Sequence, residues 1–224
     1  VLYQAYNEQD EARFVADILK DWMSSGELYS DAAVLYRSNA QSRAVEEALL
    51  RASIPYRIYG GLRFYERMEI KNAIAYLKII FNHSDNPAFE RSISNPTRGV
   101  GEKTLAKIRG TAKQFNISYI KASAKLIDEG TISGRGGSGL RSYLEFISRC
   151  KEFIEENLLS DLMEEIIKTS GLMAYHAKEP GEKGKTRVEN LEELVTATKN
   201  FEQSITEDKT NIEIAEQYLD IISL

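Results

Sequence analysis

The chain has 224 residues, of which 42% are hydrophobic and 28% charged, and its 29 basic and 34 acidic side chains give a net charge of −5. This is the composition of an ordinary folded domain. No apolar run approaches the roughly 20 residues that cross a bilayer, so we expect neither a membrane partner nor a signal peptide. The single cysteine, Cys150, excludes an internal disulfide and predicts a reducing, cytoplasmic location.

Both ends of the chain suggest a piece cut from a longer polypeptide. Val1 opens directly into an apolar run without a methionine, and Leu224 ends inside an apolar helical pattern. We therefore expect that chemistry missing from this chain is supplied by the rest of the protein.

Strand-like and helix-like patterns alternate over the first 60 residues. Asn7 is placed to cap a helix, and Ser38 with Gln41 forms a capping box for a second helix that ends at Ala52. Strands separated by helices of this length imply right-handed crossovers and a parallel sheet. The expected strands are residues 1–6, 32–36 and 54–59.

From residue 63 onward the hydrophobic periodicity predicts helices alone. The polar break at 82–87 predicts a boundary between a domain over residues 1–82 and a second domain over 83–224. Five glycines within 130–139 fit either a second, weaker hairpin or a flexible linker. The expected helices are 63–81, 88–94, 102–115, 140–157, 160–169, 187–201 and 211–224.

The most informative stretch is residues 95–104, which places Gly99 and Gly101 just before a new helix. Glycines allow the backbone to turn with positive φ and to approach a ligand closely, because they carry no Cβ. The free N–H groups at the start of the helix then face an anion. The sequence therefore predicts a helix-hairpin-helix-like turn that holds phosphates without reading bases.

The charge distribution supports the same interpretation. Residues 91–150 carry 11 basic and 4 acidic side chains (+7), whereas 1–90 carry 10 and 13 (−3) and 151–224 carry 8 and 17 (−9). Such a basic segment between acidic neighbours favours one surface that faces nucleic acid. The alternative is a charged helical surface whose charge is unevenly distributed but that has no such role. The cations expected around the turn are Arg98, Lys103, Lys107 and Arg109.

No catalytic or metal-binding motif is present in the sequence. There is no Walker A sequence, zinc-protease motif, nucleophile elbow or paired-cysteine pattern, and His83 and His176 lack metal-ligand spacing. We therefore predict no catalytic residue and no metal ligand in this chain. Any chemistry must be completed elsewhere.

Four segments are informative together, namely residues 35–43, 54–71, 95–104 and 186–194. In their order and spacing they resemble the UvrD/PcrA/Rep group of superfamily 1 ATP-dependent DNA helicases. The resemblance implies a partial RecA-like motor domain (the start of domain 2A) over residues 1–82, and a mostly helical insertion (2B) over 83–224 that is truncated at its C-terminus. The predicted fold class is therefore a partial α/β sheet followed by an all-α domain.

The resemblance also implies DNA-binding residues. In the family, the segment with Arg37 and Asn39 grips the tracking single strand, although Asn39 is also a plausible helix cap. The glycine turn resembles the duplex-contacting element of the insertion. The duplex-binding residues implied are Arg98, Gly99, Val100, Gly101, Lys103, Thr104 and Lys107.

By the same resemblance, the full-length parent is a 3′–5′ helicase that uses ATP and Mg²⁺ in DNA repair or replication and is associated with the nucleoid. The fragment itself is expected to bind no cofactor and to be inactive, since the Walker A and B motifs are absent. The expected partners are single-stranded and duplex DNA, the remaining helicase domains and repair proteins. A non-catalytic DNA- or protein-binding module, or part of a RecB-like helicase–nuclease, are the alternatives.

Two further sets of side chains are predicted to be structural. Arg187, Glu189 and Asn190 open a helix and are expected to fix the packing of the insertion rather than to contact DNA. Four aromatic residues are expected to lie in the core more readily than to stack on bases. These are Tyr56, Tyr59, Phe64 and Tyr65.

Overall fold

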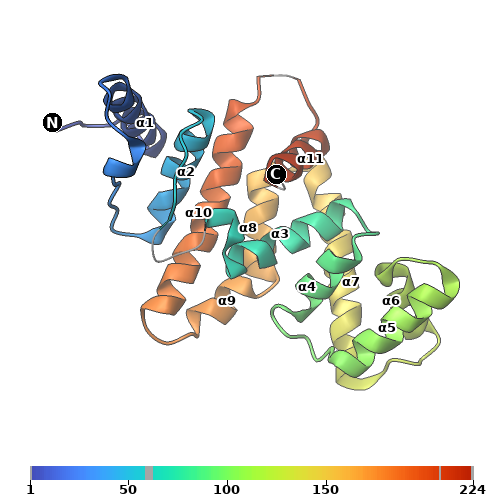
Figure 1. Ribbon diagram of the computed structural model, residues 1–224. Helices are drawn as coiled ribbons and strands as arrows, with labels where there is room; N and C mark the ends of the chain where they lie inside the picture. Colours follow the sequence, from blue (N-terminus) through green and yellow to red (C-terminus); the bar gives the residue numbers. More distant parts are fainter. Residues whose placement is uncertain (1, 59–62, 207, 223–224) are drawn as a thin grey trace. The chain divides into compact units, whose positions relative to one another are not determined.

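The computed structural model describes residues 2–58, 63–206 and 208–222. Over these residues the chain is helical and contains no β-strand, so the predicted parallel sheet is wrong. The chain divides into two compact units, Val1–Arg67 and Met68–Leu224. Figure 1 labels the helices of both units.

The predicted strands fail because the described residues offer them no pairing partner. Residues 2–5, 32–36 and 54–58 adopt neither helix nor strand, and Tyr59 lies outside the described residues. Apolar and β-branched residues favour a strand only where a neighbour completes the hydrogen-bond ladder. Leu35, which lies in the second expected strand, is 93% exposed.

The first unit is built on two helices, α1 (Glu8–Ser24) and α2 (Ser42–Arg51). Asn7 caps α1 as predicted, because its side chain accepts a hydrogen bond from the Asp10 amide at 2.8 Å. The two helices pack through an apolar cluster centred on Ala16, Leu49 and Ile54. Three short 3₁₀ turns complete the unit: η1 (Tyr29–Asp31), η2 (Asn39–Gln41) and η3 (Phe64–Glu66).

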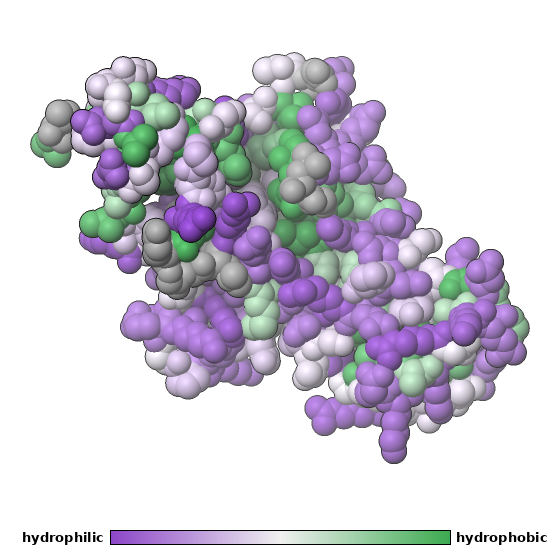
Figure 2. Space-filling model, viewed as in Figure 1, coloured by the Kyte–Doolittle hydropathy of each residue, from purple (hydrophilic) through white to green (hydrophobic). Residues whose placement is uncertain are grey.

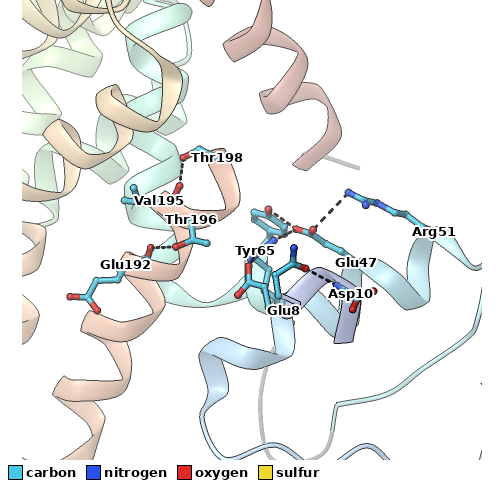
Figure 3. A network of polar contacts seen from close by, with 11 residues as sticks. Glu8, Asp10, Glu47, Arg51, Tyr65, Glu192, Val195, Thr196 and Thr198 are labelled. Atoms are coloured by element: carbon cyan, nitrogen blue, oxygen red, sulfur yellow. Dashed lines mark hydrogen bonds and ion pairs between the residues drawn. The ribbon is translucent and has the colours of Figure 1, made fainter. Parts of the chain in front are cut away.

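Charged side chains fix the inner face of α2. Arg43 is 1% exposed and donates to Glu8 at 2.8 Å and to Glu47 at 3.0 Å. Glu47 also accepts from the Tyr65 hydroxyl at 3.4 Å and lies 4.0 Å from the exposed Arg51 (Figure 3). These contacts compensate the burial of the Arg43 guanidinium, as a buried charge requires.

The second unit packs its helices around α3 (Met68–Phe81), whose apolar side chains are almost entirely buried. α3 contacts α4, α7, α8 and α10. Ile70, Ile74, Leu77 and Ile80 are buried as the predicted periodicity requires. The other helices are α4 (Asn86–Ser94), α5 (Glu102–Phe115), α6 (Tyr119–Asp128), α7 (Gly134–Glu156), α8 (Leu159–Thr169), α9 (Leu172–Ala177), α10 (Glu182–Ser204) and α11 (Asn211–Ile222).

The helices of this unit follow the sequence prediction, but several bounds differ: α7 begins at Gly134 and α10 at Glu182, both earlier than predicted. The expected helix over 63–81 is divided by Arg67, which has an extended backbone between η3 and α3. The helices α6 and α9 were not predicted. The chain divides into its two compact units after Arg67, so α3 belongs to the second unit. The sequence placed the domain boundary after residue 82.

Polar contacts join α10 to α3 and to the turn that follows α9. Asn190 donates to Glu69 at 2.6 Å, and Arg187 donates to Glu179 at 2.5 and 2.6 Å. Arg187 and Asn190 thus make packing contacts of the kind predicted, although their helix begins five residues earlier, at Glu182, and Glu189 is exposed. Phe64 is buried as expected, and Tyr56 and Tyr65 are half-buried. No described helix has both the length and the apolar character needed to cross a membrane.

Candidate nucleic-acid interface

The candidate interface is the loop between α4 and α5, which ends in the two glycines. Gly99 has φ +74°, as predicted for a turn that only glycine adopts readily. Gly101 has φ −96° and is the N-cap of α5, so the expectation of positive φ there is wrong. A Cβ on Gly101 would meet nothing within 4 Å, and this position is therefore open on its outer side.

Arg98 points into the protein. Its guanidinium donates to the carbonyl oxygens of Pro96 at 2.9 Å and Ser170 at 2.8 Å, and it lies over the rings of Tyr76 and Tyr143 at 5.4 and 5.6 Å. These contacts occupy both terminal nitrogens. The geometry therefore gives Arg98 the role of an anchor for the loop and does not support its predicted contact with a DNA phosphate.

The start of α5 presents backbone N–H groups that no side chain caps. The amides of Thr104 and Leu105 are hydrogen-bonded to the Gly101 carbonyl oxygen, which leaves the first-turn amides before them without a helical partner. Gly99, Gly101 and Lys103 are exposed and Thr104 is half-buried. The Val100 side chain is buried, so this residue can offer only its backbone.

The remaining predicted cations differ in their availability. Lys107 is exposed and makes one long contact, 3.4 Å from its Nζ to the Thr131 carbonyl oxygen. Arg109 is held by two carboxylates, donating to Glu90 at 2.6 and 2.7 Å and to Glu102 at 2.5 Å. The same contacts lower the pKa of the Glu90 carboxyl. The charge of Arg109 is thus compensated, and Lys103 and Lys107 remain as the cations on this side.

Residues 134–139 of the glycine-rich segment form the first turns of α7, not a second hairpin or a linker, and Gly130 lies before that helix. A Cβ on Gly136 would lie 3.2 Å from the Gly99 carbonyl oxygen. A Cβ on Gly139 would lie only 1.9 Å from the Arg98 carbonyl oxygen. The glycines therefore let α7 approach the backbone of the candidate interface. Their i, i+3 spacing, which places them on one helical face, is the sequence signal that could have revealed this role.

The surface around this interface is polar. Figure 2 shows hydrophilic residues over most of the visible face of α5 and α6. Lys103, Lys107, Lys113 and Arg135 are all exposed. Among the described residues, no group of three or more His, Cys, Asp or Glu side chains is arranged to hold a metal ion.

The predicted single-strand contacts lie in the first unit. Arg37 is exposed just before η2, and its backbone amide donates to Gln41 Oε1 at 3.1 Å. Gln41 also accepts from the Ser38 amide at 3.1 Å, which is half of the expected capping box. The Asn39 side chain lies outside what the structure describes. Because there is no sheet, the sheet edge that was expected to position Arg37 and Asn39 is absent from the described residues.

Comparison with known proteins identifies the family. The model for the UvrD-like helicase C-terminal domain matches residues 1–224, the whole chain. The chain belongs to the UvrD-like helicase C-terminal domain family. This confirms the resemblance found in the sequence.

Individual relatives of this UvrD-like domain carry helicase names. It is 48% identical over 200 residues, 89% of the chain, to DNA helicase II of Escherichia coli (strain K12), of which it covers 28%. It is 37% identical to ATP-dependent DNA helicase PcrA of Bacillus subtilis (strain 168), with 93% of the chain and 28% of the relative covered. For PcrA of Leuconostoc citreum the identity is 35%, with 99% and 30% covered. The chain thus spans less than a third of these relatives.

Proposed function

We propose that this chain is the DNA-contacting part of an ATP-dependent 3′–5′ DNA helicase, and that the segment 99–107 binds the sugar–phosphate backbone of duplex DNA. The relatives are named as DNA helicases, two of them as ATP-dependent, which supports the class of activity. ATP and Mg²⁺ would be bound with the remaining helicase domains of the parent. Association with the nucleoid and with repair proteins belongs to the same proposal.

The observation that carries the proposal is the outward-facing start of α5. Gly99 and Gly101 expose backbone without side chains, Lys103 and Lys107 are exposed beside it, and no side chain caps the helix. Backbone amides at the start of a helix, together with lysine side chains, bind phosphate oxygens. Such contacts do not depend on the base sequence. A motor that steps past every base requires contacts of this kind.

The open space beside Gly101 supports an external ligand. Nothing in the described part of the chain would clash with a Cβ there. A DNA backbone seated on the α5 start would meet that Cβ instead. The proposed duplex contacts are therefore Gly99, the Val100 backbone, Gly101, Lys103, Thr104 and Lys107. Arg37 and Asn39 remain proposed contacts to single-stranded DNA.

Titration of a labelled blunt duplex by fluorescence anisotropy tests this function. If three or four phosphates are held, affinity should fall about tenfold or more between roughly 50 and 200 mM salt. Gly101→Ala should weaken binding at low salt, while Gly110→Ala, in the middle of α5 with open space around it, should not. An affinity that does not change with salt, or equal binding by both variants and the original chain, would contradict the proposal.

A further inference from the structure

Arg135, the second residue of α7, lies against the candidate interface although it is far from it in sequence. The position of a Cβ on Gly99 is 3.0 Å from Arg135 Cγ, 3.4 Å from its Cδ and 3.5 Å from its Nε. The side chain of Arg135 therefore runs along the face of Gly99 that a larger residue would fill. A Cβ on the adjacent Gly136 would lie 3.2 Å from the Gly99 carbonyl oxygen, so the missing side chain at Gly136 leaves room for α7 beside the turn.

The Arg135 guanidinium is available to a ligand. The residue is exposed, and within the described parts of the chain its side chain forms no hydrogen bond or ion pair. Arg98 and Arg109, which the sequence placed around the turn, are bound to carbonyl oxygens and carboxylates. Arg135 is thus an arginine whose terminal nitrogens are free beside the turn.

Guanidinium chemistry favours a phosphate at this position. A planar guanidinium donates two parallel hydrogen bonds to a phosphate, whereas the ammonium of Lys103 acts as a compact point charge. The stem of Arg135 is held against Gly99, so less conformational entropy is lost when its head binds. An acidic protein surface would offer single carboxylates and lacks the regular spacing of a DNA backbone.

We propose that Arg135 is a further duplex-binding residue, which contributes a phosphate contact from α7 to the surface formed by Gly99, Gly101 and Lys103. This inference rests on the proposed function of that surface. It makes the interface a composite of two segments, the turn before α5 and the start of α7. Both segments must then be in place for full affinity.

Fluorescence anisotropy titrations of duplex DNA over a range of salt concentrations test the proposal. Three variants each replace one cation with neutral glutamine: Arg135→Gln, Lys103→Gln and Lys113→Gln. Lys113 lies at the far end of α5 and is exposed. We expect Arg135→Gln and Lys103→Gln each to weaken binding several-fold and to reduce the slope of log affinity against log salt by about 0.9. Lys113→Gln should leave the slope unchanged. Arg135→Lys, which keeps the charge, should retain the slope while losing part of the affinity.

The outcomes separate this inference from the function on which it rests. If Lys103→Gln weakens binding and Arg135→Gln leaves affinity and slope unchanged, Arg135 is not a contact and the inference is overturned. If neither changes affinity or slope, the duplex-binding function fails with it. If Arg135→Gln and Arg135→Lys lose the same amount of affinity, and neither changes the slope of log affinity against log salt, Arg135 has a packing role. That result would also overturn the proposal. Binding of an acidic protein in place of DNA would overturn it as well.

Discussion

Asn190 donates a hydrogen bond of 2.6 Å to Glu69, and both side chains are buried where α10 meets α3. A buried carboxylate needs such donors, because it has lost its water. Arg187 supplies a positive charge nearby, since its Nε lies 3.7 Å from the other carboxylate oxygen of Glu69.

Replacing Asn190 should therefore destabilise the protein. We expect Asn190→Ala to lower the free energy of unfolding by about 2 kcal/mol, since a hydrogen bond to a charged group is lost and the carboxylate stays buried. Urea denaturation followed by circular dichroism measures this. Thr196→Ala, on the same helix, removes only a long contact to the Glu192 carbonyl oxygen (Figure 3) and should change stability by less than about 0.5 kcal/mol. Equal midpoints for the two variants would show that the Asn190 contact contributes nothing.

Gly184 should be intolerant of a side chain. A Cβ there would lie 2.3 Å from the Glu179 carbonyl oxygen and 2.9 Å from that of His176, so Gly184→Ala must displace the start of α10. We expect a loss of about 1–3 kcal/mol in the free energy of unfolding. Gly110→Ala, in an open part of α5, is the control and should gain about 0.5–1 kcal/mol by helix propensity. A thermal melt in which both variants gain stability would refute the close approach at Gly184.

Cys150 should react with thiol reagents only in the unfolded chain. Burial raises the pKa of its thiol from 9.0 to about 12, and the residue is 1% exposed. At pH 8 we expect no reaction of the native protein with an aromatic disulfide and full reaction in urea, as measured by absorbance. Rapid labelling of the native protein would mean that α7 opens locally.

The same pKa shift predicts a pH dependence of stability. The unfolded thiol ionises as the pH rises through about 9 and the folded thiol does not. The contribution of Cys150 is therefore fully present below pH 9 and is lost as the pH rises toward about 12. Urea midpoints measured between pH 8 and pH 10, compared with those of Cys150→Ala, isolate this contribution. A Cys150→Ala variant with an equally steep decline would assign the loss to other groups.

Removing the carboxylate of Glu102 should strengthen duplex binding. Glu102 is in the first turn of α5, next to the proposed phosphate contacts, and its side chain is 75% exposed. Glu102→Gln removes this repulsion, while Arg109 keeps its two bonds to Glu90. We expect an affinity several-fold higher at low salt. Glu129→Gln, which disrupts an exposed pair with Lys125 on α6, is the matched control. An unchanged affinity for Glu102→Gln would place the phosphates away from this helix start.

The sequence predicted the helices more reliably than the sheet. α5 begins and ends at the residues expected, because an apolar period of 3.6 and the glycines before it are local signals. The strand-like run at 32–36 carried the right residue types, yet pairing depends on distant segments that no local pattern reveals. Sequence reasoning therefore overstated the α/β character of the first unit.

For the proposed site, the sequence predicted some local features of the turn but not how its side chains pack. The turn at Gly99 and the exposure of Lys103 agree with expectation. The inward direction of Arg98 depends on Tyr76 and Tyr143, and the approach of Arg135 depends on the packing of α7. Both are tertiary relationships between residues far apart in sequence. A glycine-rich composition, which is shared by linkers and close-packed helices, could not distinguish the two for residues 130–139.

The contacts of Arg98 determine which motion a probe on the loop between α4 and α5 would report. Its guanidinium is hydrogen-bonded to the carbonyl oxygens of Pro96 and Ser170 and lies over two tyrosine rings, so the loop is tied at Arg98 to the helices around it. A spin label at the exposed Thr97 would consequently tumble with the surrounding helices, and its spectrum would report the rotational diffusion of the whole 68–224 body.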